Sequence, residues 1–401
     1  MKLFFYISLL FCTLFACTDQ AKVSFETPAL LERSEKIQYF NEWSEIRTKY
    51  ADLKHILTKD ASKIDALIQL TNLFIAEARV TGEHGHYYPA AMTTITQALN
   101  QKNISKDQKF LALSAKASIE LSLHNFKEGL KIAQEAITLN PYNAQIYGAL
   151  VDAYVELGQY DKARETVDKM VSIRPDLRSY SRVSYLREIY GLPDESIKAM
   201  QMAVEAGSPG SEEKSWAALQ LAQLCLRYDK VKEAESILVQ LLSERPDYPF
   251  GKAALADVYL KQNKIAEAEK ELKEACLIIP EVGFYVQLAE IYKKEERKNE
   301  FDEKIKEIME MLEDDMKHGH NMSLEYAAIY TDLLENPDKA LEYIQQDQTL
   351  RPDNIDINRR LAKIYMLKKD KLKAQEFIQK AEKTNSKHPE LKILQTALAS
   401  M

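Results

Sequence analysis

The stretch that decides the fold lies near the middle of the chain, where residues 146–175 read IYGALVDAYVELGQYDKARETVDKMVSIRP. On each side of Gly158, apolar residues recur three and four positions apart, which is the spacing of one face of a helix. Pro175 follows the second apolar series, at a place where no further helical N–H is needed. The stretch therefore predicts two amphipathic helices joined by a tight turn.

Prolines recur along the chain at a nearly constant spacing. Six of the 12 prolines stand at positions 141, 175, 209, 246, 280 and 352. The intervals between them are 34, 34, 37, 34 and 72 residues, and the last is close to two intervals of 34. A period of 34 residues is typical of two-helix units that stack, because each unit leaves an apolar side for its neighbour to cover.

The composition is consistent with a stacked array that folds in water. The chain has 401 residues, more than one compact core usually holds, and 46% of them are hydrophobic and 29% charged. Only 11 glycines are present, which argues against the many tight turns of a β barrel. The formal net charge of -7 would repel a polyphosphate, so we expect no nucleic-acid partner.

The same side chains resemble the tetratricopeptide repeat family. Residues 146–175 carry the family's signature in order, and residues 254–280 repeat it with Leu255, Ala256, Tyr259, Ala268, Ala275 and Pro280. The resemblance implies an all-α solenoid of about nine antiparallel helix pairs, wound into a right-handed superhelix. On this register we expect leading helices in residues 29–60, the repeat array in residues 61–388 and a C-terminal capping helix in residues 389–401.

The first residues indicate export from the cytoplasm. An apolar run from Leu3 to Ala16 follows a single lysine, which predicts a signal peptide over residues 1–16. The letters LFAC at positions 14–17 resemble the lipobox of bacterial lipoproteins, which implies a lipid on Cys17 and a polar tether over residues 17–28. Thr18 follows the cysteine, and by the same resemblance we expect an anchor in the outer membrane of the cell envelope. An ordinary signal peptide that ends in a chance cysteine is the alternative.

The first helices of the repeats should line a concave groove, where relatives hold peptides or extended protein segments. Aromatic and apolar side chains that face water there are candidate anchors, because their exposure costs solvation free energy. The alternative is that each of them packs under a neighbouring loop or helix. The candidate groove residues are Asp152, Tyr185, Glu188, Trp216, Leu219, Gln223, Leu226, Phe250 and Asp257.

Two histidine pairs are weak candidates for a metal site. His84 and His86 lie in one glycine-containing turn, and His318 and His320 flank a glycine in another. A stable site needs three or four ligands with second-shell partners, so solvated histidines in polar loops are the simpler interpretation. The chain contains no nucleophile elbow, Walker loop or dinucleotide fingerprint, and we expect neither an enzyme nor a cofactor.

Three hypotheses about function follow. The first is a non-catalytic scaffold of the cell envelope that binds a partner protein or peptide in its groove. The second is a surface lipoprotein that captures a solute or glycan for an outer-membrane transporter, although such proteins usually carry longer loop insertions. The third, with the least support, is an enzyme or metal carrier built on the turns.

Overall fold

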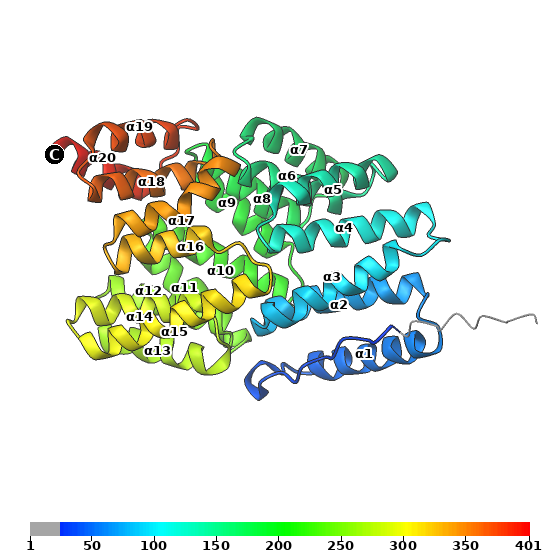
Figure 1. Cartoon of the computed structure of the whole chain (residues 1–401). Helices are drawn as coiled ribbons and strands as arrows, with labels where there is room; N and C mark the ends of the chain where they lie inside the picture. Colours follow the sequence, from blue (N-terminus) through cyan, green and yellow to red (C-terminus); the bar gives the residue numbers. More distant parts are fainter. Residues whose placement is uncertain (1–24) are drawn as a thin grey trace, which may run out of the picture.

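The computed structural model describes residues 25–401, and every regular element in this range is helical (Figure 1). The predicted signal peptide and Cys17 lie outside the described residues. Within residues 25–401, none of the helices combines the length and apolar character that crossing a bilayer requires.

Nine antiparallel helix pairs make up the array within the described part of the chain, as the 34-residue period predicts. The eighth first helix is irregular, because α16 continues into a π-helix, η2. The pairs are α2 (Ile64–Thr81) with α3 (His84–Leu99), α4 (Lys106–Ser122) with α5 (Phe126–Leu139), α6 (Ala144–Glu156) with α7 (Tyr160–Ile173), α8 (Leu177–Ile189) with α9 (Pro193–Glu205), α10 (Glu212–Arg227) with α11 (Val231–Glu244), α12 (Pro249–Lys261) with α13 (Ile265–Ile278), α14 (Val282–Lys294) with α15 (Lys298–Lys317), α16 (Ser323–Ala328) and η2 (Ile329–Leu333) with α17 (Pro337–Leu350), and α18 (Ile355–Leu367) with α19 (Lys371–Ala381).

Further elements flank the array. Before it, the short 3-10 helix η1 (Glu35–Ile37) and α1 (Glu42–Lys59) follow an extended segment over residues 25–34. After it, α20 (Pro389–Ser400) buries Leu391 and Leu394 and leaves Ile393 exposed, as a terminal helix with one apolar face should.

Alanines allow the two helices of a pair to approach closely. Ala163 on α7, Ala268 on α13 and Ala374 on α19 have no exposed surface, and each lies in a hydrophobic cluster with larger aliphatic or aromatic side chains. A residue without side-chain bulk at these places lets the facing helix pack at interior density. The family signature therefore marks contact positions of the core.

The array curves with its first helices on the inside. Successive first helices contact each other directly, as α4 does with α6, α6 with α8, and α8 with α10. Successive second helices make no comparable contact within residues 25–401. The second helices therefore splay apart on the convex side, and the first helices form the inner face.

The superhelix closes on itself after just under six repeats. Four successive turns at the ends of first helices each meet a turn between repeats that lies 194 to 197 residues later. In Figure 1 the start of α3 lies against α15, which belongs to the later superhelical turn. We call this row of contacts the seam; its pairs are Gly82 with Ile279, His124 with Asn321, Gly158 with Asp353, and Gly191 with Asn385.

The segment before the array is also tied to both superhelical turns. Arg33 is buried and donates two hydrogen bonds to the carboxylate of Glu77 on α2, at 2.6 and 2.8 Å. Its third nitrogen binds Glu42 on α1, and the other oxygen of Glu42 accepts from Arg245, which follows α11. Ile37 joins the hydrophobic cluster of α12–α14. Buried charges paired in this way hold residues 33–42 in place on the array.

Candidate functional site

The exposed side of α10 shows which residues face the inside of the superhelix. Its solvent-accessible stripe runs through Trp216, Gln220, Gln223 and Arg227, spaced four, three and four residues apart. The prediction that Leu219 lines the groove is wrong, because this side chain is 4% exposed and lies in the hydrophobic core.

Leu226 and Phe250 also pack against hydrophobic cores rather than standing free. Leu226 is half-buried against the same cluster as Leu219. The ring of Phe250 lies 5.5 Å from that of Phe284, centre to centre, in an edge-on arrangement. For these two positions the structure supports the packing alternative, since each supplies area to a contact between helices.

Two aromatic side chains remain open to solvent on neighbouring first helices. Tyr185 on α8 and Trp216 on α10 are each 39% exposed, and α8 contacts α10. Surrounding protein nevertheless raises the pKa of the Tyr185 phenol well above its usual value, by desolvation and by the carboxylates of Asp356 and Glu156. Asp356 belongs to α18, so a carboxylate from the later superhelical turn contributes to this shift.

The three predicted groove carboxylates link successive first helices. Asp152 on α6 accepts two hydrogen bonds from the Arg182 guanidinium on α8, at 2.5 and 2.8 Å. Glu188 on α8 accepts from Arg227 on α10 at 2.5 Å. These pairs join helices that are 30 and 39 residues apart in the sequence, so they align neighbouring repeats.

Asp257 makes the same kind of link with a neutral partner. Its carboxylate on α12 accepts a hydrogen bond from the Gln287 amide on α14, at 2.7 Å. Burial without a cation raises the pKa of Asp257 to about 6. Sequence reasoning placed these acids on the inner face but missed Arg182, Arg227 and Gln287, which occupy the following repeat.

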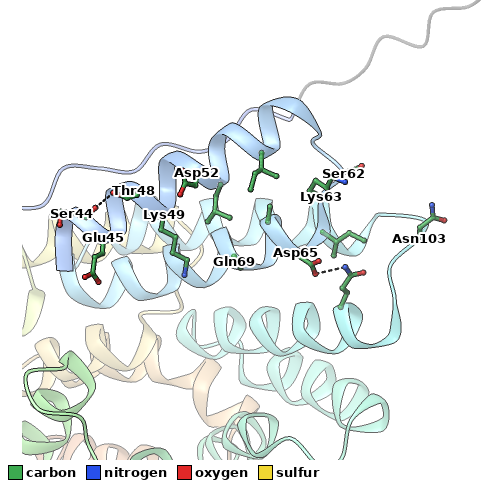
Figure 2. Close-up of a pocket in the computed structure, with 15 residues that line it drawn as sticks. Ser44, Glu45, Thr48, Lys49, Asp52, Ser62, Lys63, Asp65, Gln69 and Asn103 are labelled. Carbon is green, nitrogen blue, oxygen red and sulfur yellow. Dashed lines mark hydrogen bonds between the residues drawn. The ribbon is translucent and has the colours of Figure 1, made fainter. Parts of the chain in front are cut away.

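A polar hollow of about 830 Å³ lies where the array begins (Figure 2). Glu45, Lys49 and Asp52 of α1 form one wall, and Asp65 and Gln69 of α2 form the other. The side chain of Gln108 on α4 donates to Asp65 at 2.9 Å and closes the floor. The sequence did not reveal this hollow, because the register of residues 29–60 could not be read from the repeat period.

The histidines gather in a different combination from the predicted pairs. His84, His124 and His320 meet at the seam, and the rings of His84 and His124 lie 5.6 and 5.8 Å from that of His320. His86 instead contacts the carbonyl of Ala29, and His318 contacts that of Asp314. Over the described residues, no three His, Cys, Asp or Glu side chains converge closely enough to hold a metal ion.

These helices and side chains define the class of the protein. It is an α-solenoid whose inner face carries exposed aromatic side chains and ion pairs that link successive first helices. Residues 120–188 and 229–281 match the tetratricopeptide repeat family. These two stretches are tetratricopeptide repeats, and the nine helix pairs continue the same two-helix architecture beyond the matched residues.

Several solved structures resemble the chain. PilF of Pseudomonas aeruginosa is 14% identical, over 59% of this chain and 99% of that one, with a TM-score of 0.42. A tetratricopeptide repeat protein from Parabacteroides merdae is 17% identical, over 64% and 97%, with a TM-score of 0.44. A human IFIT1 dimer with PPP-AAAA is 12% identical, over 88% and 95%, with a TM-score of 0.48. These likenesses concern repeat architecture and do not identify a ligand.

Proposed function

We propose that the protein is a non-catalytic scaffold of the bacterial cell envelope, which binds an extended segment of a partner protein along its inner face. Tetratricopeptide repeat proteins generally mediate protein–protein interaction. The observation that carries the proposal is the pair Tyr185 and Trp216, which are exposed on first helices that contact each other. Burial of exposed aromatic side chains by a partner contributes a large share of the binding free energy in many interfaces.

The paired carboxylates have a supporting role in this proposal. Because Asp152 and Glu188 are already satisfied by Arg182 and Arg227, they keep the aromatic positions in register and leave the anchoring to apolar contact. A partner segment would lie across α8 and α10 and bury Tyr185 and Trp216 together.

Photo-crosslinking tests the site directly. A photoreactive amino acid at position 216 should capture an envelope protein, whereas the same group at position 142 should not, because Tyr142 is 83% exposed on a turn between repeats. Tyr185→Ala and Trp216→Ala should each weaken the captured partner's affinity at least about tenfold, with an unchanged circular dichroism spectrum. Tyr142→Ala is the matched control. Equal capture at positions 216 and 142 would remove the inner face as the binding site.

The fluorescence of Trp216 distinguishes binding of a partner protein from capture of a solute. The second tryptophan, Trp43, is 4% exposed, so a ligand on the inner face should change the fluorescence of Trp216 alone. Quenching by the partner peptide and no response to a panel of glycans is the expected result. Glycan-dependent quenching that disappears in Trp216→Phe would instead support a transporter-associated lipoprotein.

The envelope location rests on the LFAC letters at positions 14–17. Cys17→Ala should release the protein from the membrane fraction, because a lipid on this cysteine would be the only anchor in the proposal. Membrane association that survives the substitution would contradict the lipid anchor and leave the inner-face test unaffected.

A further inference from the structure

A second cavity lies at the seam, away from Tyr185 and Trp216. Its volume is about 1170 Å³, and it lies between the turns that follow α2 and α4 on one side and α14, α15 and α16 on the other. Residues from both superhelical turns therefore form its wall, around the cluster of His84, His124 and His320.

The charges of this cavity are of one sign. No Lys or Arg is among the lining residues, whereas seven carboxylates are. Lys304 and Lys306 lie within ion-pair distance of Glu307 and Glu310. For the other five, no Lys or Arg nitrogen in residues 25–401 comes within 4.0 Å: Glu83, Glu281, Asp314, Asp315 and Glu325.

A buried side chain in the same wall also lacks a partner. His320 is 9% exposed, and its Nε2–H donates to the carbonyl of Ser122 at 2.8 Å. Its Nδ1 has no hydrogen-bond partner in the described structure and faces the Asp315 carboxylate, 3.9 Å away. One oxygen of Glu325 is likewise buried without a partner. Unsatisfied polar atoms of this kind are rare in folded proteins, and a water, an ion or a ligand commonly satisfies them.

The pKa values show that the cavity wall disfavours the ionised forms of these groups. Burial, reinforced by Asp314, raises the pKa of Asp315 to about 6, and burial also raises the pKa values of Glu281 and Glu325. Burial and the two neighbouring imidazoles lower the pKa of His320 to about 4. Every one of these shifts favours the neutral form, as expected where carboxylates lose water and gain no cation.

The remaining wall suits a ligand with an apolar body. Tyr88, Tyr285, Met311 and Met322 line the cavity between the carboxylates. The carboxylates without a Lys or Arg partner come from separate elements: Glu281 precedes α14, Asp315 lies on α15 and Glu325 on α16. Negative charges set apart along a partly apolar wall match positive charges joined by methylene chains.

We propose that this cavity binds an organic polycation, a chain of ammonium groups separated by short methylene segments. A free polyamine and a lysine-rich peptide share this chemistry. The carboxylates of Glu281, Asp315 and Glu325 take the ammonium groups, and the aromatic and methionine side chains cover the methylenes. This site is separate from the inner face, so the proposal does not depend on the scaffold function.

Calorimetric titration of the full chain with spermidine tests the proposal. We expect saturable binding, with a Kd at least about tenfold weaker in Glu281→Gln and in Asp315→Asn. Glu303→Gln is the matched control, because Glu303 is exposed on α15, outside the cavity, and the substitution removes the same charge. An equal loss in Glu303→Gln, or the absence of saturable spermidine binding, would overturn the proposal.

Two further arms identify the source of the ligand and exclude a metal. Trilysine amide that binds more tightly than spermidine would assign the ammonium groups to a protein, and the reverse order would assign them to a free polyamine. Fully acetylated spermidine should not bind. Binding of Zn²⁺ or Mg²⁺ without binding of spermidine would overturn the polycation assignment.

The pH dependence provides a test that needs no variant. Protons compete with the cation for Asp315, whose pKa is about 6, so spermidine affinity should rise severalfold from pH 5 to pH 7.5. A constant affinity over this range at fixed ionic strength would contradict a role for the buried carboxylates.

Discussion

The seam is built in two ways, and the difference is clearest between its second and third contacts. At Gly158, backbone packs on backbone: a Cβ on this residue would lie 2.5 Å from the carbonyl carbon of Asp353. At His124, one repeat earlier, the Asn321 N–H donates to the Leu123 carbonyl at 3.2 Å, and histidine side chains add to this backbone contact. His124 Nδ1–H donates to the carbonyl of Asn321 at 2.9 Å, and His320 donates back across the seam.

Both residues adopt the same left-handed backbone, with φ of 71° at Gly158 and 62° at His124. The turn geometry is therefore common to both contacts, and the space between the two superhelical turns differs. At Gly158 only glycine fits against Asp353. At His124 the turn accommodates a side chain, imidazoles add hydrogen bonds to the backbone contact, and the cavity lies beside them. The contact at Gly158 stabilises the closed superhelix, and the contact at His124 has room for a ligand next to it.

The strongest way to break the close contact is Gly158→Ala. We expect a loss of about 3 kcal/mol in the free energy of unfolding, because the methyl group overlaps Asp353 and the left-handed backbone adds its own cost. Urea unfolding measures this loss. Gly210→Ala is the control, since Gly210 has φ of 72° but no atom within 4 Å of the added carbon. Equal losses in the two variants would show that Gly158 is needed only for the left-handed turn and not for the contact with Asp353.

The histidine contact should respond to acid where the glycine contact does not. The pKa of His320 is lowered to about 4 in the folded state, so its contribution to stability is present above pH 6.5 and is lost as the pH falls toward 4. Acidification from pH 7 to pH 5 therefore costs about 2 kcal/mol through this residue. Asp315, whose pKa is raised to about 6, changes in the opposite sense and offsets part of this cost.

His320→Asn should remove that sensitivity. Between pH 7 and pH 5, the free energy of unfolding should fall by about 2 kcal/mol less in the variant than in the unsubstituted protein. Urea unfolding at both pH values measures this difference. His55→Asn, on the exposed side of α1, should leave the pH dependence unchanged. If His320→Asn lost as much stability between pH 7 and pH 5 as the unsubstituted protein, the imidazole would not be buried as described.

The smallest effect is expected at the first seam contact. Gly82 also has a left-handed backbone, but a Cβ there would lie 3.7 Å from Ile279, which is an ordinary contact distance. Gly82→Ala should therefore cost about 1 kcal/mol, the backbone penalty alone, by the same urea measurement. A loss as large as that of Gly158→Ala would indicate that the seam is equally tight along its length.

The sequence predicts the repeats well because each helix pair is a local unit. The proline period and buried alanines such as Ala163 and Ala268 act within one repeat, so the nine pairs follow from the pattern. The predicted inner stripe of α10 contained Leu219, whereas the solvent-accessible residue is Gln220. An error of one residue rotates a helical position by about 100°, which is enough to place a buried residue on the predicted surface.

The seam could not be predicted, because it depends on the sum of many small rotations. Each repeat turns slightly relative to the last, and the total over about six repeats decides which turns meet. For the same reason, His84, His124 and His320 are far apart in the sequence, and only the closed superhelix brings their rings together. Sequence reasoning treated the histidines as two separate pairs, whereas the structure brings both pairs to the wall of one cavity, with His124 beside them.

The spacing of about 195 residues across the seam restricts how such a protein can evolve. Open solenoids tolerate the gain or loss of a repeat, since each unit touches only its neighbours. Here, duplication of one unit between Gly158 and Asp353 would shift every later turn by a full repeat and set mismatched loops against one another. Natural variants of this protein should therefore keep the number of repeats constant between these residues and change length only at the ends.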